Sequence, residues 1–432
     1  MKFSFKIVLF LIFINGCSLN PNSKIWSPNT KIAKDEILQI KYISKKEEVL
    51  NKELNVGLKL NINKLKINNT DPANLTNNIF SNFEGKLKSK SKYSYSKIKK
   101  FDQYDPEISF VDDHFIFFNS KGTILKFNEK SNLVWKKNYY TKSQVKNNPV
   151  LFFSNNSDFL VVADTVAKIY ALNLKNGELV WSNENSSPFN SQIKIFEDKV
   201  FLVDAQNSIH CYSIIDGKKI WKFNTDKPLI KSQKKLSIVI KDNKVIFNNS
   251  IGDITAINIS TGKLIWQTPT QSSKIYREAM FLNSSDLVLK DNSIFYSNNT
   301  NNFYSIDAET GILNWSQKIN SSLRPVSIDN FIFTITNEGY FVVIDENGRI
   351  IRSTYLLKNI KEKKRKKIKF TGFVLGSKNI YLSTTSGRLF IVETSTGNLK
   401  NILKIDNEKI SRPSIYKNNL YIAKNNSVIK LN

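Results

Sequence analysis

The sequence repeats one short pattern: an apolar run, a polar turn that contains Gly, and a Trp four residues after that Gly. Its four clearest copies are Ile169–Trp181, Ile209–Trp221, Ile254–Trp266 and Tyr304–Trp315. A tight turn between antiparallel strands needs a residue with positive φ, and Gly adopts that conformation without a Cβ clash. The pattern therefore predicts a series of strand–turn–strand units, each closed by the large apolar surface of a Trp.

The spacing of these units predicts the architecture. The Trp residues lie 40 to 49 residues apart, at Trp135, Trp181, Trp221, Trp266 and Trp315. Weaker copies follow at Asp345–Gly348, with Arg352 in the Trp position, and at Thr394–Gly397, with Asn401 there. A repeat of about 40–50 residues with four short strands is typical of a β-propeller blade. We therefore expect an all-β propeller, in which the five Trp residues have a structural, blade-docking role.

Eight units can be counted, which predicts eight blades. They begin near Asp105, Asn148, Ser187, Lys227, Ser273, Leu323, Lys369 and Ser411. Most begin beside a Pro (Pro106, Pro149, Pro188, Pro228, Pro325 and Pro413), where a first strand loses nothing by lacking an N–H. Ten residues before the repeat Gly, a second turn is predicted at Gly252, Gly387, Asn207, Asn301 and Ala167.

The two ends of the repeat region predict how the ring closes. The hairpin of Asn419–Ala423 and Ser427–Leu431 ends the chain one strand short of a blade. Tyr93–Ile98 alternates like a strand, yet no complete blade precedes it. We therefore expect Tyr93–Ile98 to complete the eighth blade, since this closure removes both free sheet edges.

The N-terminus has the features of an export signal. Lys2 and Lys6 precede the apolar run Ile7–Ile14, which is too short to span a bilayer. The run ends at Cys17 in a sequence that resembles a bacterial lipobox, which implies that the Cys17 thiol is acylated. The alternative is a signal peptide that precedes a Cys by chance. We therefore expect three regions: a lipoprotein signal peptide (residues 1–16), a lipidated tether and extended arm (17–91), and the propeller (92–432).

Composition excludes several kinds of chemistry. The formal charge of +27 is spread along the chain, and an exported protein does not meet cytoplasmic nucleic acid, so no nucleic-acid role is expected. One basic run, Lys361–Lys367, is either a solvated loop or a contact for anionic lipid or an acidic partner. His114 and His210 lack metal-ligand spacing, and His210 with the neighbouring Cys211 is expected to be a packed structural pair. With Cys17 lipidated, Cys211 has no disulfide partner. No catalytic or metal site is predicted.

The repeat copies at Ala256–Trp266 and Ile306–Trp315 resemble those of the pyrroloquinoline-quinone (PQQ)-like propellers. That superfamily contains quinoprotein dehydrogenases and the BamB lipoproteins of the outer-membrane β-barrel assembly (BAM) machinery. The dehydrogenases carry two adjacent cysteines over the cofactor, and this chain has no Cys-Cys. A lipobox, a short arm and one lean propeller are together similar to the BamB family. The resemblance implies a scaffold that is not an enzyme and has no cofactor, anchored at the periplasmic face of the outer membrane.

The resemblance also implies a partner and a contact surface. BamB proteins bind the POTRA domains of the central barrel-assembly protein and act with the other BAM subunits. Their contact residues include the connection between the fourth and fifth blades, which in this chain is Thr270–Asn283. The candidate partner-binding residues are Tyr276, Arg277, Met280 and Phe281, because aromatic residues, Met and Arg are enriched at interface cores. The alternative is that Met280 and Phe281 pack beneath the blade.

Two other functions stay open on the sequence. One is a periplasmic PQQ-dependent oxidoreductase, and the other is an envelope propeller that binds carbohydrate or peptidoglycan. A fold does not determine a function, so the propeller alone does not separate these alternatives from the scaffold.

Overall fold

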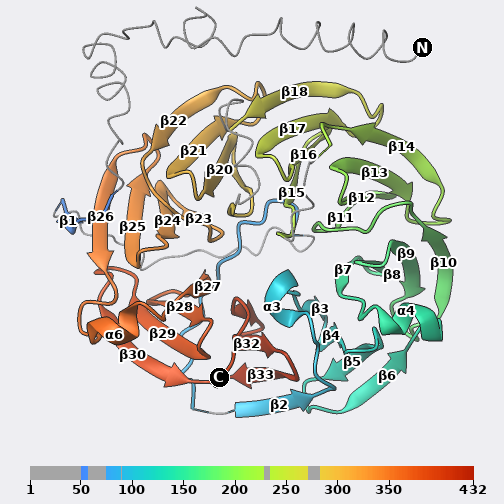
Figure 1. The fold of residues 1–432 in the computed structure, drawn as a ribbon, viewed down its shortest axis with the longest axis horizontal. Coiled ribbons are helices and arrows are strands. Elements are labelled where there is room, and N and C mark those ends of the chain that lie inside the picture. Colours follow the sequence, from blue (N-terminus) through green and yellow to red (C-terminus); the bar gives the residue numbers. More distant parts are fainter. Residues whose placement is uncertain (1–49, 57–73, 89, 228–233, 271–282) are drawn as a thin grey trace, which may run out of the picture. The chain divides into compact units, whose positions relative to one another are not determined.

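Eight antiparallel sheets follow one another around a ring, as the blades of a propeller (Figure 1). The computed structural model describes residues 50–56, 74–88, 90–227, 234–270 and 283–432, which all belong to one compact unit, Val49–Asn432. The predicted all-β, eight-bladed propeller is confirmed.

Blades 1 to 4 each contain four strands, which follow one another from the axis outward. Blade 1 contains β3 (Ser109–Val111), β4 (His114–Phe118), β5 (Ile124–Asn128) and β6 (Leu133–Lys137). Blade 2 contains β7 (Leu151–Asn155), β8 (Phe159–Asp164), β9 (Lys168–Asn173) and β10 (Leu179–Glu184). Blade 3 contains β11 (Lys194–Phe196), β12 (Lys199–Val203), β13 (Ser208–Ser213) and β14 (Lys219–Asn224). Blade 4 contains β15 (Ile238–Lys241), β16 (Lys244–Asn248), β17 (Asp253–Asn258) and β18 (Leu264–Pro269).

Blades 5 to 8 continue the ring. Blade 5 contains β19 (Val288–Lys290), β20 (Ser293–Asn298), β21 (Asn302–Asp307) and β22 (Leu313–Gln317). Blade 6 contains β23 (Val326–Ile328), β24 (Phe331–Ile335), β25 (Tyr340–Asp345) and β26 (Ile350–Tyr355), with β1 (Leu54–Asn55) as a fifth, outermost strand. Blade 7 contains β27 (Phe370–Leu375), β28 (Asn379–Thr384), β29 (Arg388–Glu393) and β30 (Leu399–Lys404). Blade 8 contains β31 (Ser414–Tyr416), β32 (Asn419–Lys424), β33 (Ser427–Leu431) and β2 (Lys90–Ser94).

Among the described residues, three short helices lie in the connections: α3 (Phe101–Tyr104), α4 (Lys142–Lys146) and α6 (Glu362–Arg365). Within the part of the chain that the structure describes, no helix has the length and apolar character needed to span a membrane. The helices therefore lie outside the sheets, and the fold is built from strands.

The core lies between neighbouring blades. The second and third strands of a blade are nearly continuous apolar runs, because both of their faces are covered by adjacent blades. In blade 2, for example, five of the six residues of β8 are buried, whereas only one residue of the outermost strand β10 is buried. One apolar cluster joins Ile246 and Trp266 of blade 4 to Ile294 and Tyr296 of blade 5.

An N-terminal strand closes the ring, as the sequence predicts, although the strand lies three residues earlier than expected. β2 pairs with β33, with Tyr93 opposite Val428. Beyond Ser94 the chain leaves the ladder, and Ile98 donates its backbone N–H to the Asn425 carbonyl at the β32–β33 turn. The expected strand Tyr93–Ile98 is therefore wrong from Tyr95 onward, because the pairing ends where its partner strand turns.

The predicted second turns adopt the expected conformation. The φ angles are +97° at Gly252, +61° at Asn207 and +73° at Ala167. Two predicted blade entries, Lys227 and Ser273, lie well before the first strands β15 and β19, because long connections precede both. In the other six blades the first strand begins within seven residues of the predicted entry.

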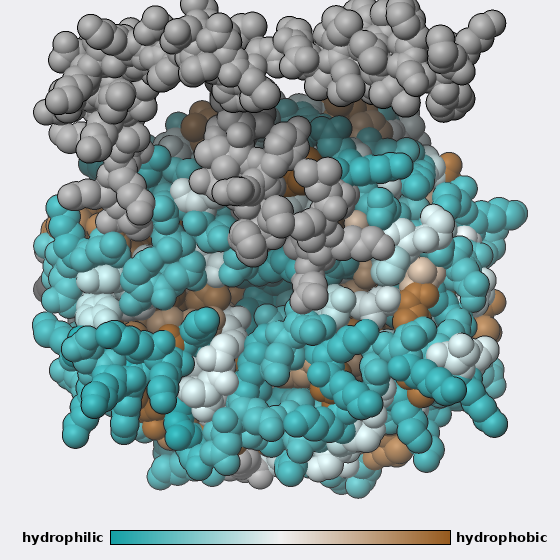
Figure 2. Space-filling model, viewed as in Figure 1, coloured by the Kyte–Doolittle hydropathy of each residue, from teal (hydrophilic) through white to brown (hydrophobic). Residues whose placement is uncertain are grey.

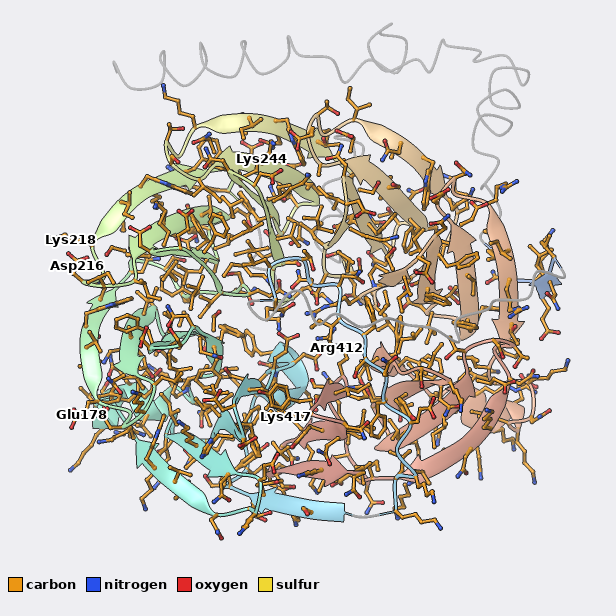
Figure 3. All side chains as sticks on the ribbon, turned by 180° about the vertical axis from the view of Figure 1, so that it is seen from behind. Glu178, Asp216, Lys218, Lys244, Arg412 and Lys417 are labelled. Carbon is orange, nitrogen blue, oxygen red and sulfur yellow. The ribbon has the colours of Figure 1, made fainter. Side chains whose placement is uncertain are left out.

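The described part of the arm binds the propeller in two places. Residues 50–56 lie along the outer edge of blade 6, where Leu54 pairs with Ser353. Residues 74–88 cross the middle of the ring, as the blue segment in Figure 1 and its pale counterpart in Figure 3 show. The alternation of apolar and polar residues over Val56–Ile62 predicts a further strand in the arm, but only Val56 of this segment lies within the described residues.

Candidate functional site

Charged side chains from five blades meet around the axis of the propeller. Each stands just before the first strand of its blade: Glu107 before β3, Asp286 before β19, Arg324 before β23 and Arg412 before β31. Lys235, before β15, joins them. We call these five residues the axial cluster. Figure 3 shows Arg412 near the middle of the ring, where the first strands converge.

Arg324 is the centre of the axial cluster. Its Nη2 donates to Oε1 of Glu107 at 2.8 Å, and its Nε donates to Oδ2 of Asp286 at 2.5 Å. The side chain is only 3% exposed. Glu107 also pairs with Lys235 at 3.0 Å and with Arg412 at 3.2 Å. The Glu107 carboxylate therefore forms ion pairs with three positively charged side chains.

The pKa shifts show how the charges are balanced. Burial alone would raise the pKa of Glu107, but Lys235, Arg324 and Arg412 outweigh it and hold that pKa well below its ordinary value. Burial is likewise outweighed at Arg324, whose pKa is raised by Asp286 and Glu107. At Arg412 burial dominates and the charge of Arg324 adds to it, so the pKa of Arg412 falls to about 10. The carboxylates thus compensate Arg324 more fully than Arg412.

A cavity of about 80 Å³ adjoins the axial cluster. Its wall includes Tyr104 of α3, Ser322, Thr371 and Ser411, together with all five cluster residues. A larger channel, of about 1150 Å³, reaches from Glu107, Lys235 and Arg412 to the arm. The inner strands β3, β7 and β11 line this channel, so the axis of the propeller is hollow between the arm and the axial cluster.

The arm forms backbone hydrogen bonds with the exposed edges of the inner strands, one blade after another. Ile240 of β15 donates its N–H to the Leu75 carbonyl, and Leu289 of β19 donates to the Thr76 carbonyl, both at 2.9 Å. Further along, Ser81 donates to the Leu375 carbonyl of β27 at 3.0 Å. An unpaired buried N–H or C=O is unfavourable, so these bonds stabilise both the arm and the inner strands.

Asn77 anchors the arm at the axis. It is fully buried, and its Nδ2 lies 2.9 to 3.0 Å from four acceptors, among them the carbonyl oxygens of Ile238 and Leu287. Lys194 of β11 donates to its Oδ1 at 2.7 Å. One arm residue therefore connects the inner strands of three blades.

Each of the five repeat Trp residues lies on the outermost strand of its blade and packs against the next blade. A Cβ on Gly217 would approach the Trp181 ring to 2.6 Å, and the Trp181 Nε1 donates to the Ile214 carbonyl at 2.7 Å. Trp221, Trp266 and Trp315 make the equivalent bonds to Ile259, Ala308 and Glu346. Trp135 also packs on a Gly, Gly177. The equivalent carbonyl there, that of Leu174, accepts a hydrogen bond from Lys126 Nζ instead of from the indole.

The predicted partner-binding residues Tyr276, Arg277, Met280 and Phe281, and the predicted lipidation site Cys17, lie outside the described residues. The ends of the partner connection are held by blades 4 and 5. Thr270 donates its N–H to the Gly252 carbonyl at 3.2 Å, and Tyr304 donates its hydroxyl to the Thr270 carbonyl at 2.9 Å. On the other side, Asn283 stands three residues before Asp286, so this connection leads directly into the axial cluster.

His210 and Cys211 are packed in blade 3. His210 Nε2 lies 2.9 Å from Oδ2 of Asp204, and both side chains are buried. Burial lowers the pKa of His210 and raises the pKa of Cys211 to about 12, which disfavours thiolate formation at neutral pH. The described residues contain no group of three or more His, Cys, Asp or Glu side chains that could hold a metal ion.

The basic run forms α6 and its flanks at the outer edge of the ring. Arg365 is held by the carbonyl oxygens of Ile360 and Lys358, at 2.5 and 2.8 Å, and lies over the Tyr355 ring. The neighbouring lysines are exposed, and hydrophilic side chains gather over this helix in Figure 2. Arg365 thus has a structural role, while the lysines form a solvated face.

The axial cluster was not predicted from the sequence. A signal was nevertheless present, because three of its members adjoin an entry Pro: Pro106-Glu107, Arg324-Pro325 and Arg412-Pro413. The Pro marks the point where each blade begins at the axis, so its charged neighbour is placed to face the channel. Asn77 carried no comparable signal.

The model of a protein family described as outer membrane protein assembly factor BamB matches residues 120–354, more than half of the chain. No curated protein matches the sequence significantly. Among solved structures, BamB from Moraxella catarrhalis superimposes with a TM-score of 0.63 at 15% identity, covering 79% of this chain and 100% of that one.

Other solved propellers are similar to nearly the same degree. A quinohemoprotein alcohol dehydrogenase from Comamonas testosteroni has a TM-score of 0.58 at 10% identity, covering 80% of this chain and 77% of that one. The computationally designed protein Ika8 has a TM-score of 0.59 at 13% identity, covering 82% and 98%. At these identities the structural likeness shows the fold alone.

Proposed function

The chain belongs to the family of the outer membrane protein assembly factor BamB, and we propose on this basis that it is a non-catalytic scaffold for β-barrel assembly. The observation that carries the proposal is the family match over residues 120–354, which spans β5 of blade 1 to β26 of blade 6. In this function the propeller binds the POTRA domains of the central assembly protein, alongside the other BAM subunits.

The proposal places the protein at the periplasmic face of the outer membrane, held by a lipid on Cys17. Partner binding is assigned to Tyr276, Arg277, Met280 and Phe281. The support for this assignment is chemical, because an Arg among aromatic and Met side chains is the composition found at interface hot spots.

The scaffold function is tested by affinity purification from a detergent-solubilised cell envelope. The tagged full-length protein is expected to retain the barrel-assembly protein, and isolated POTRA domains are expected to bind the purified chain. A tagged variant in which Arg277 is replaced by Glu serves as the matched control. If neither the assembly protein nor its POTRA domains bind the parent chain, the scaffold proposal is wrong.

A second candidate, a PQQ-dependent oxidoreductase, is favoured by the similarity to dehydrogenase propellers. The residues at the axis do not fit the calcium ion that accompanies this cofactor. Calcium prefers several free carboxylate or carbonyl oxygens, whereas Glu107 and Asp286 already pair with Arg324, Arg412 and Lys235. An absorbance titration with PQQ and Ca²⁺ distinguishes the two functions, because the scaffold is expected to leave the cofactor spectrum unchanged.

A further inference from the structure

The axial cluster contains more positive than negative charge. Its three cations are Arg324, Arg412 and Lys235, and its two carboxylates are Glu107 and Asp286. Lys234 lies in the same cavity wall and adds a further positive charge. The nearby Asp105 does not restore the balance, because it pairs with Lys409 at 2.7 Å.

The imbalance is concentrated on two guanidinium groups. Nη1 of Arg324 is buried and has no hydrogen-bond partner among the residues that the structure describes. Arg412 is the less compensated of the two Arg residues, as the fall in its pKa shows. A guanidinium stays protonated in proteins, so it is not neutralised by losing a proton. A buried cation of this kind is stabilised only by a further anion or by hydrogen-bond acceptors.

The cavity beside these groups has room for such an anion. Its volume of about 80 Å³ exceeds by several-fold the roughly 10–15 Å³ needed for one water molecule. Ser322, Thr371 and Ser411 also line this cavity, but their hydroxyl groups already donate to Asn337, Ile410 and the Arg412 carbonyl, so the positively charged side chains are the groups that would hold an anion. Gly372 lies against Arg412, where an added Cβ would approach the Arg412 side chain to 2.5 Å. The backbone at Gly372 is therefore packed closely against the aliphatic part of the Arg412 side chain.

We propose that this axial cavity is a binding site for a small oxyanion, a carboxylate or a phosphate, held by Arg324, Arg412 and Lys235. The planar guanidinium group matches both oxyanions with two parallel hydrogen bonds. The site opens toward the channel through Glu107, Lys235 and Arg412, which line both cavities. It does not depend on the scaffold function, since none of its residues belongs to the proposed partner connection.

The test is calorimetric titration of the full-length protein with inorganic phosphate and, separately, with acetate, at constant ionic strength maintained with chloride. Saturable binding of at least one of the two ions is expected, and the two titrations show which oxyanion the site prefers. Arg412→Gln is expected to weaken that binding at least tenfold, because a charge-assisted hydrogen bond is lost. Thermal melts without added anion are expected to show Arg412→Gln no less stable than the parent, since the variant relieves repulsion with Arg324.

The matched control is Lys244→Gln, which removes a cation of similar exposure, 16% against 19% for Arg412. Lys244 pairs with Glu309 and lies away from Arg412 in Figure 3. Its affinity for the anion is expected to equal that of the parent. Should Arg412→Gln fail to fold, Lys235→Gln provides the same comparison. The proposal is wrong if neither ion binds saturably, or if the cluster variant binds as tightly as the control.

Discussion

The indole of Trp266 in blade 4 lies over Gly311 of blade 5, where an added Cβ would meet the ring at 2.6 Å. The Trp266 Nε1 donates a hydrogen bond of 3.3 Å to the Ala308 carbonyl in the same turn. The repeated Gly therefore has two functions. It adopts a φ of +73°, and it leaves room for the aromatic ring of the preceding blade. The turn motif of one blade is also the docking surface for its neighbour.

Replacing Gly311 with Ala is expected to destabilise the propeller by roughly 1–3 kcal/mol, because a non-Gly residue at positive φ is strained and its Cβ meets the indole. Trp266→Ala is expected to cost roughly 3–5 kcal/mol, the usual range for a buried aromatic residue. Chemical denaturation measures both. Ile312→Ala, at a neighbouring residue that is 67% exposed, is the control and should stay within about 0.5 kcal/mol of the parent. Parent-like stability of Gly311→Ala would contradict the docking role.

Asn77 is expected to control the attachment of the arm. Asn77→Ala removes its hydrogen bonds to three blades and leaves buried acceptors unpaired, which should destabilise the fold by roughly 1–3 kcal/mol. The amides of Ile240 and Leu289 donate to the arm, so their hydrogen exchange should accelerate in the variant. Glu84→Ala, which removes an exposed arm ion pair with Lys378, should leave both amides unchanged. Unaltered exchange at these amides in Asn77→Ala would show that Asn77 does not hold the arm.

Asp164 is expected to make stability fall as the pH rises. Burial raises the pKa of this carboxyl from its ordinary value of 3.8 to about 6. The folded state therefore binds the proton more tightly than the unfolded state, and the stability present below about pH 4 is lost as the pH rises toward 6. At about 1.36 kcal/mol per pKa unit, the loss is roughly 3 kcal/mol. Asp164→Asn should remove it, which denaturation curves at pH 4, 5 and 6 would show.

Asp216 provides the control for this pH dependence, because its pKa is shifted in the opposite direction. A hydrogen bond from Ser213, with others from Lys218, lowers the pKa of Asp216 to about 2. Its contribution is present above about pH 4 and is lost as the pH falls toward 2. Asp216→Asn should therefore leave the slope between pH 4 and 6 as in the parent. Equal slopes in the Asp164 variant and the parent would refute the prediction for Asp164.

Arg277 is expected to be a hot spot for POTRA binding. Arg277→Ala should weaken affinity by roughly 2 kcal/mol or more, and Arg277→Glu should weaken it further, because the reversed charge faces an acidic partner. Surface plasmon resonance with isolated POTRA domains measures both, after melts confirm that each variant is folded. Arg349→Ala, at a residue whose side chain is 79% exposed on blade 6, is the control. Equal affinities in all four proteins would remove Arg277 from the interface, and Lys361–Lys367 would be tested next.

Cys17 is expected to determine membrane attachment. In the predicted lipoprotein, a thioether-linked lipid and an N-acyl chain on Cys17 would supply the two hydrophobic signals that stable anchoring needs. The next residue, Ser18, is not Asp, so we expect from the bacterial sorting rule that the lipoprotein resides in the outer membrane. Cys17→Ala should release the protein into the soluble periplasmic fraction, which fractionation and immunoblotting would detect. A variant that stays in the outer-membrane fraction in the parent's amount would overturn the lipoprotein prediction.

The sequence by itself determined the blades. A turn is built by consecutive residues, so Gly with positive φ, the Trp that follows it and the apolar runs can be recognised in the four clear repeats without knowing the rest of the fold. Ring closure was predictable for a related reason. The C-terminal blade lacks a fourth strand, and one strand before the first blade has no partner, so the two complete each other. The strand proved to be Lys90–Ser94.

Only the tertiary structure decided what faces the axis. Glu107, Asp286, Arg324 and Arg412 are far apart in the sequence, and they meet because the ring brings the start of every blade to the same place. The partner of each Trp was likewise hidden, since the indole packs on the next repeat rather than on its own. Asn77 acquires its role from the unpaired edges of the inner strands, which exist only once the propeller has closed. Local turn chemistry is encoded in neighbouring residues, whereas contacts across the axis depend on the geometry of the whole ring.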